Sequence, residues 1–170
     1  MIRHVVPALL LLALAGPAQA QVLGEDAAAC TTGVPAILVS VIGLKDRKGE
    51  LKLELYPGTE EDFLKDDRDL LREGKLFRRV RVPTPLQGDM QMCVRVPRPG
   101  RYALLLTHNR DGKNKFSFWS DGAGFVSPKK IGRSRPKLTQ ALVDVPMGVR
   151  SVTIQPQYLR GLSGFGPVKN

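Results

Sequence analysis

The chain has 170 residues, with 26 Lys and Arg against 16 Asp and Glu, so its formal net charge is +10. This length is typical of one domain, and a content of 42% hydrophobic and 25% charged residues excludes a disordered or collagen-like chain. No apolar stretch after residue 20 approaches the roughly 18 residues that a membrane-spanning helix requires. A multi-domain machine and a multi-pass transporter are therefore excluded.

The first twenty residues predict a cleaved signal peptide. Arg3 gives a basic start, residues 5–15 form an apolar run, and Ala18-Gln19-Ala20 has the small-x-small pattern behind which signal peptidase cuts. We expect the cut after Ala20 and a mature chain that begins at Gln21, located in the periplasm or secreted. A lipoprotein cleavage box ending at Cys30 is the alternative, but the residue three places before this cysteine is Ala where such a box normally has Leu.

Cys30 and Cys93 are the two cysteines of the chain, and both lie in the expected mature part. An exported protein with two cysteines is expected to join them in one disulfide. By the chain-entropy relation, this bond would contribute about 4 kcal/mol to the free energy of unfolding. Two unpaired thiols, one of them buried in a strand, are the alternative.

Seven runs of residues predict β-strands, because they are rich in β-branched residues or alternate between apolar and polar side chains. They cover residues 36–44, 51–56, 76–82, 90–96, 102–107, 138–145 and 149–158. Gly49 lies in the polar stretch between the first two runs, which favours a β-hairpin. Thr59 and the three acids that follow it are typical of a helix start, so we expect at most one short helix, near 60–72.

Closely spaced strands joined by turns that contain Pro and Gly predict an all-β fold. We expect a single antiparallel β-sandwich of about seven strands, immunoglobulin- or transthyretin-like, over residues 36–158. Residues 21–35 precede it as an N-terminal segment, and residues 159–170 follow as a flexible tail. Tyr102 begins a strand two residues after Gly100, so it either anchors a corner through its hydroxyl or is an ordinary strand tyrosine.

Four segments carry a resemblance to a known family. They are the run 41–56, the Pro-Gly-x-Tyr corner within 96–103, the polar turn 107–115 and the Gly-x-Gly-Phe sequence at 122–125. In this order and spacing, over about residues 36–158, they resemble an exported bacterial family catalogued as domain of unknown function 2141. The resemblance implies an immunoglobulin- or transthyretin-like sandwich and a periplasmic or secreted location, and it implies no known activity.

The polar turn and the residues that follow it offer oxygen atoms of the kind that a hard cation such as Ca²⁺ prefers. The candidate ligands are Asn109, Asp111, Asn114 and Asp121. Three Lys and Arg residues interleave with them and repel a cation, and an Asx-type turn explains the same residues. We therefore expect neither a metal ion nor a cofactor.

Catalytic residue types are present near the same turn. His108, Asp111 and Ser117 or Ser120 include the types of a nucleophilic triad, but no Gly-x-Ser-x-Gly elbow accompanies them. The sequence therefore predicts a protein that is not an enzyme.

Charge is distributed unevenly along the chain. Residues 45–73 have a net charge of −3, whereas residues 74–137 have fifteen Lys and Arg, three Asp and a net charge of +12. The candidate anion-binding residues are Arg78, Arg79, Arg81, Lys129, Lys130, Arg133, Arg135 and Lys137. The aromatic side chains of Phe116, Phe118 and Trp119 lie between these two groups in the sequence. A generally basic surface without a ligand is the alternative.

These observations favour an exported, non-catalytic binding or interaction module of the bacterial cell envelope. Its expected partner is an anionic glycan or lipid of the envelope, met through the basic surface. Specific nucleic-acid binding is not expected, because no recognition motif is present. The alternative is an envelope-associated enzyme or metal-dependent module that uses the 108–121 turn. If the basic segment binds a ligand, its two groups of cations must meet in space although they lie far apart in the sequence.

Overall fold

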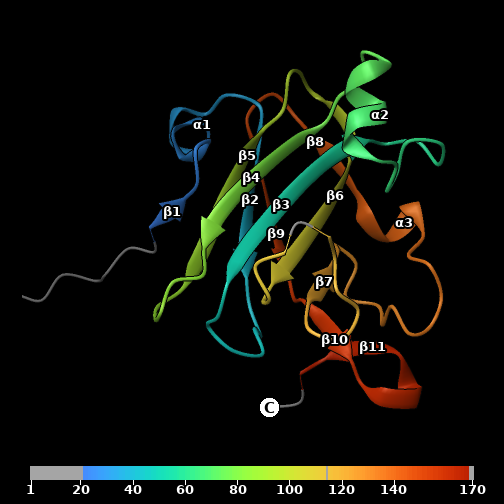
Figure 1. Cartoon of the computed structure of the whole chain (residues 1–170). Helices are drawn as coiled ribbons and strands as arrows, with labels where there is room; N and C mark the ends of the chain where they lie inside the picture. Colours follow the sequence, from blue (N-terminus) through green and yellow to red (C-terminus); the bar gives the residue numbers. More distant parts are fainter. Residues whose placement is uncertain (1–20, 114, 169–170) are drawn as a thin grey trace, which may run out of the picture.

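Two β-sheets share one apolar core in the computed structural model, which describes residues 21–113 and 115–168. Within these residues the chain is mostly β, with eleven strands and three short α-helices (Figure 1). The all-β prediction is therefore confirmed at this level. The predicted signal peptide lies outside the described residues.

The first sheet has four strands in the order β1-β5-β2-β9. Its strands are β1 (Val22–Leu23), β5 (Met90–Arg95), β2 (Ala36–Val41) and β9 (Val149–Ile154). β2 runs antiparallel to β5, but β2 and β9 are parallel, and so are β1 and β5. The prediction of a purely antiparallel arrangement is wrong for this sheet, because β9 enters it from a strand of the other sheet and not through a hairpin from β2.

The second sheet has seven strands and is antiparallel in every pairing. Its main path is β11 (Phe165–Pro167), β10 (Gln157–Leu159), β7 (Gly122–Gly124), β6 (Gly100–Asn109), β3 (Glu50–Pro57) and β4 (Arg78–Pro83). β8 (Leu142–Val145) pairs with the first part of β6. The long strand β6 therefore has β3 along one edge and both β8 and β7 along the other.

Alternation along the strands decides which side chains enter the core. Leu51, Leu53 and Leu55 of β3 are fully buried between the sheets, while Lys52 and Glu54 lie on the opposite face of the second sheet. β6 alternates in the same way, since its even-numbered residues 102–106 join the core. The second sheet therefore has an inner apolar face and an outer face of mixed character.

The connection between β2 and β3 differs from the predicted hairpin. β2 belongs to the first sheet and β3 to the second, and residues 42–49 cross from one to the other. β2 and β3 both contribute apolar side chains to the same core, but they do so from opposite sides of it. The two strands therefore do not pair with each other. Hydrophobic alternation specifies the buried face of a strand but not its hydrogen-bonding partner.

The helices are α1 (Ala27–Thr32), α2 (Asp67–Arg72) and α3 (Leu138–Ala141). The expectation of at most one helix, near 60–72, is wrong in number, and α2 begins later than expected. Leu64 has a φ of 61°, which interrupts right-handed helical geometry, and the Asp66 carboxylate then caps α2 by accepting from the backbone N–H of Arg68. No helix among the described residues has the length and apolar character to cross a membrane.

A disulfide joins Cys30 of α1 to Cys93 of β5, with 6.0 Å between the Cα atoms, as the sequence predicts. Cys93 lies on the outer face of the first sheet, where it packs with Ala29 and Ala36 in a small apolar cluster. The bond therefore fastens the N-terminal segment to the sheet.

Short elements of regular structure lie in the C-terminal segment for which the sequence predicted a flexible tail. A 3₁₀ helix, η1 (Gly161–Ser163), leads into β11, which pairs with β10. In Figure 1 these elements lie at the end of the molecule opposite α2. This segment is part of the site described next.

A cavity on the outer face of the second sheet

Only part of the outer face of the second sheet is covered by helices. Near α2 and α3, a second apolar cluster includes Tyr56, Phe63, Leu70, Phe125 and Leu138. The neighbouring part of the same face forms the floor of a cavity of about 1030 Å³. Side chains from β3, β4, β6 and β7 therefore face a hollow and not a second layer.

Three segments form the walls of this cavity. They are residues 116–121, residues 131–136 and residues 159–165. Three phenylalanine rings of the walls contact one another, with ring centroids 5.3 Å apart for Phe116 and Phe118, 6.0 Å for Phe116 and Phe165, and 6.3 Å for Phe118 and Phe165. The C-terminal segment is attached to the 131–136 segment by two backbone hydrogen bonds between Gly132 and Phe165, of 2.9 and 2.7 Å. The walls are thus aromatic and held together by backbone pairing.

A network of charged side chains lies on the floor, and most of its members are paired. Arg79 Nε donates to Glu54 Oε1 at 2.6 Å, and Arg79 Nη1 donates to Asp67 Oδ2 at 2.9 Å. The Tyr56 hydroxyl donates to the other Glu54 oxygen at 3.0 Å, and burial together with the Glu54 charge raises the pKa of Tyr56. The Glu54 charge is therefore balanced inside the cavity.

Lys52 is paired in a similar way. Its Nζ lies 3.3 Å from Glu50 Oε1, which also accepts from Asn109 Nδ2 at 2.9 Å. Burial alone would raise the pKa of Glu50, but the hydrogen bonds from Asn109 and Lys52 outweigh it and the pKa lies below its usual value. Lys52 therefore contributes a compensated charge to the floor.

Arg133 and Arg135 are the lining cations without an acidic partner among the described residues. Both are exposed, and neither forms an ion pair within that part of the chain. The one hydrogen bond that Arg135 makes there is long, 3.5 Å from Nη2 to the carbonyl oxygen of Phe63. An anion that enters the cavity would therefore meet two uncompensated guanidinium groups.

The three arginines of β4 do not form one basic surface. Arg78 pairs with Asp26 of the N-terminal segment, Arg79 with Glu54, and Arg81 with Glu50 at 3.4 Å. Alternate residues of a strand point to opposite faces, so Arg78 lies away from the cavity while Arg79 lines it. The cavity thus brings Arg79 together with Arg133 and Arg135, and it does not bring in Arg78 or Arg81.

The two carboxylates among the candidate metal ligands accept hydrogen bonds within the turn. Asp121 accepts from the backbone N–H groups of Arg110 and Ser117, each at 2.9 Å, and from the Ser120 hydroxyl at 3.1 Å. Asp111 accepts from the backbone N–H of Lys113 at 3.0 Å. These are the bonds of turns closed by Asp side chains. Asn109 donates its Nδ2 to Glu50 as described above, while its buried Oδ1 has no hydrogen-bond partner among the described residues. Asn114 lies outside the described residues.

His108 is a buried residue of the core edge. Its Nε2 lies 2.8 Å from the carbonyl oxygen of Lys48 and its Nδ1 lies 2.7 Å from the Tyr158 hydroxyl, so Nε2 donates and Nδ1 accepts. Burial lowers the pKa of His108 and raises the pKa of Tyr158 to about 12. These partners are not the Ser and Asp of a nucleophilic triad.

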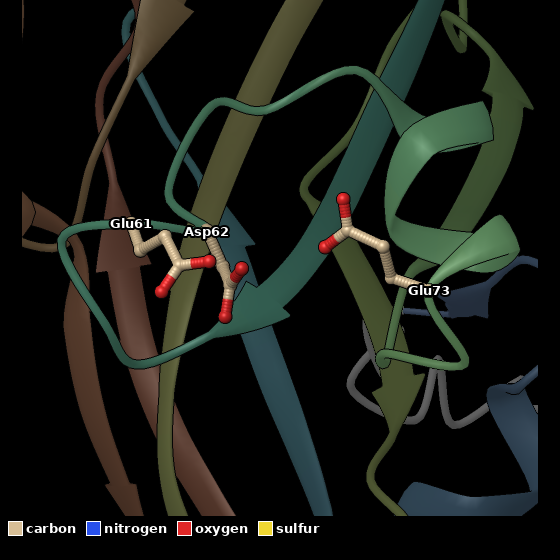
Figure 2. A group of neighbouring side chains, drawn as sticks. All are labelled: Glu61, Asp62 and Glu73. Carbon is tan, nitrogen blue, oxygen red and sulfur yellow. The ribbon is translucent and has the colours of Figure 1, made fainter.

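A group of three carboxylates that sequence reasoning did not single out lies at the turn before α2 and at the end of that helix. Figure 2 shows Glu61 and Asp62 near one another with Glu73 beyond them. Lys75 Nζ contacts all three carboxylates, at 3.0, 2.6 and 3.2 Å respectively. The hydrogen bond from Lys75 lowers the pKa of Asp62. An ammonium group therefore already supplies the positive charge that these acids share.

The fold and the cavity define the chain as a two-sheet β protein with an aromatic cavity on the outer face of one sheet. The model of a family described as uncharacterized protein conserved in bacteria (DUF2141) matches residues 39–153, and the chain belongs to this family. No curated protein and no solved structure matches the chain.

Proposed function

We propose that this protein is an exported, non-catalytic binding protein of the bacterial cell envelope whose cavity takes an anionic amphiphile. The apolar body of the ligand would lie against the aromatic walls, and its anionic group would meet Arg133 and Arg135. The fold under this proposal is a sandwich of the immunoglobulin or transthyretin type.

The observation that carries the proposal is the cavity itself. Ligand sites commonly have volumes of about 300–1000 Å³, apolar and aromatic walls, and a few polar groups that fix orientation. This cavity has about 1030 Å³, aromatic walls and two unpaired cations. A cationic ligand is disfavoured because the lining carboxylates Glu54 and Asp121 already have hydrogen-bond partners, whereas Arg133 and Arg135 have no acidic partner among the described residues.

Binding of a fluorescent anionic amphiphile tests the proposal. We expect anilinonaphthalene sulfonate to increase in fluorescence with the mature protein and to be displaced by oleate more effectively than by oleyl alcohol. The double variant Arg133→Gln/Arg135→Gln should weaken oleate binding by about tenfold, because each exposed pair with an anion contributes up to about 1 kcal/mol. Filling the floor with Ala123→Phe should abolish displacement, since Ala123 lines the cavity.

Lys129→Gln/Lys130→Gln is the matched control. It removes the same charge from the residues just before the 131–136 segment, but neither lysine lines the cavity. Equal loss of oleate binding in both double variants would contradict the proposed site. Equal displacement by oleate and oleyl alcohol would contradict the proposed anionic group.

Export is the second part of the proposal, and it rests on the Ala18-Gln19-Ala20 pattern. The disulfide supports it over the lipoprotein alternative, because a cysteine that carries a lipid on its sulfur cannot also bond to Cys93. Mass spectrometry of the exported protein should give an N-terminus at Gln21. A lipidated Cys30 would contradict both the cleavage site and the disulfide.

A further inference from the structure

The mouth of the cavity exposes large apolar side chains. Phe118, Trp119 and Leu162 line the cavity, yet they are 65%, 87% and 89% exposed. They lie on two separate walls of the cavity, residues 116–121 and residues 159–165. These walls approach one another through the contact of Phe118 with Phe165, at 6.3 Å between ring centroids. These side chains therefore form one apolar rim and not scattered surface residues.

A basic segment flanks this rim. Its exposed cations are Lys129, Lys130, Arg133, Arg135 and Lys137. The backbone bonds between Gly132 and Phe165 place the segment directly beside η1 and β11. None of these five cations forms an ion pair with any of the described residues. The rim is thus bordered by charge of one sign.

We propose that the cavity mouth docks on the surface of an anionic lipid bilayer. Trp, Phe and Leu at loop tips enter the boundary between headgroups and acyl chains, and neighbouring Lys and Arg are attracted to anionic headgroups. A bilayer supplies an apolar layer and a negative layer side by side, which matches the rim and its basic border. The proposal goes beyond the cavity and its ligand, because it concerns the surface around the opening and names the partner of that surface.

Tryptophan fluorescence tests docking directly, because Trp119 is the single tryptophan of the chain. The probe is a vesicle of phosphatidylcholine with about one third phosphatidylglycerol, compared with a vesicle of phosphatidylcholine alone. We expect the mature protein to sediment with the anionic vesicles, with a blue shift of Trp119 emission and quenching by lipids brominated in the acyl chain. Sedimentation of the protein with neither vesicle would overturn the proposal.

A pair of leucines gives a matched control. Leu162 and Leu86 are almost equally exposed, at 89% and 87%, but Leu86 lies in the loop between β4 and β5 and does not line the cavity. Leu162→Ser should weaken vesicle binding by about tenfold, since the buried apolar area sets the strength of insertion. Leu86→Ser should leave it unchanged. Equal effects of the two substitutions would overturn the proposed rim.

The charge component has its own variant. Lys129→Gln/Lys130→Gln should weaken binding to anionic vesicles by roughly fivefold for each cation near the surface, and rising salt should weaken it further. The same variant should leave oleate binding in solution unchanged, because neither lysine lines the cavity, so failure of docking and failure of the cavity proposal are distinguishable. Filling of the cavity by lipid without docking would shift Trp119 emission while the protein stays in the supernatant, which overturns docking alone. A shift that depends on protein concentration without vesicles indicates self-association and also overturns docking.

Discussion

Arg79 and Glu54 form an ion pair on the cavity floor, with 2.6 Å between Nε and Oε1 across the neighbouring strands β4 and β3. Arg79 also stacks over the Phe77 ring, at 4.9 Å from its guanidinium carbon to the ring centroid. Burial alone would lower the pKa of Arg79, but the Glu54 charge and hydrogen bond outweigh it and the pKa is raised. The pair thus keeps the floor nearly neutral and leaves the excess positive charge to Arg133 and Arg135.

Glu54→Gln should have opposite effects on stability and on binding. It removes a charged partner of Arg79, so the free energy of unfolding should fall by about 1–3 kcal/mol. It also leaves more positive charge on the floor, so the anionic probe should bind about fivefold more tightly. Glu60→Gln is the control, because Glu60 lies on an exposed turn and does not line the cavity. Weaker probe binding by the Glu54→Gln variant would contradict this electrostatic description.

Asp26 and Arg78 should make the stability of the fold depend on pH. Asp26 is buried and accepts hydrogen bonds from the Arg78 guanidinium and from the backbone N–H of Arg95. Burial alone would raise the pKa of Asp26, but these bonds outweigh it and the pKa lies below the usual value. The contribution of this carboxylate is therefore complete above about pH 4 and is lost as the pH falls through the lowered folded-state pKa.

The measurement is urea unfolding of the wild-type protein and Asp26→Asn between pH 7 and pH 2. The variant should be less stable by about 2 kcal/mol at neutral pH, and the difference should shrink below about pH 4. Asp144→Asn is the control, because Asp144 pairs with Arg101 on the exposed surface and should have little effect. A difference that stays constant down to pH 2 would show that Asp26 does not act through its charge.

The disulfide should stabilise the protein by restricting its unfolded chain. Cys30 and Cys93 are 63 residues apart in the sequence, and the chain-entropy relation gives a contribution of about 4 kcal/mol for a loop of this size. Cys30→Ala/Cys93→Ala should lower the free energy of unfolding by this amount, and reduction of the wild-type protein should lower it to a similar value. Alkylation of both thiols in the folded, unreduced protein would show that the bond is not formed.

Sequence alternation predicted the buried faces of several strands correctly. Met90, Met92 and Val94 of β5 enter the core, and the intervening Cys93 lies on the other face, as the period of two requires. Tyr102 also fits the corner that its position suggests, because its hydroxyl donates to the carbonyl oxygen of Arg98 at 2.6 Å. Both features depend on residues that are close in the sequence, which explains why they were predictable.

Features that depend on distant partners were not predictable in the same way. The basic run of β4 suggested a continuous positive surface, but Asp26, Glu50 and Glu54 reach it from other parts of the chain. Whether a surface arginine is neutralised depends on tertiary contacts that a local charge count does not include. The sequence also could not show whether the chain after β2 forms a hairpin or crosses to the other sheet, because this too depends on tertiary contacts.

The cavity was visible in the sequence only in part. Phe116, Phe118 and Trp119 stood out as an aromatic group near basic residues. The third wall was missed, because Phe165 lies between two glycines in a segment that has no strand-like alternation. The pairing of Phe165 with Gly132 requires two backbones to approach closely. The glycines on either side of Phe165 were the only feature of the sequence that pointed to such an approach.

Gly164 should be essential for this wall. It has a φ of 70°, and a Cβ atom placed on it would lie 2.2 Å from the carbonyl oxygen of Gly132. Real Cβ atoms do not approach an oxygen so closely, so Gly164→Ala must separate the C-terminal segment from the 131–136 segment. We expect faster hydrogen exchange at Phe165 and weaker binding of the anionic probe.

Gly161→Ala separates the effect of backbone strain from the effect of close approach. Gly161 also has a positive φ, of 55°, but a Cβ atom placed there has no neighbour within 4 Å. A left-handed conformation costs an alanine roughly 1 kcal/mol, so both variants should lose a similar amount of stability from strain. Only Gly164→Ala should lose probe binding as well, because only there does the new methyl group meet the opposite backbone. Equal probe affinity in the two variants would show that the pairing of Gly132 with Phe165 does not form a wall of the binding site.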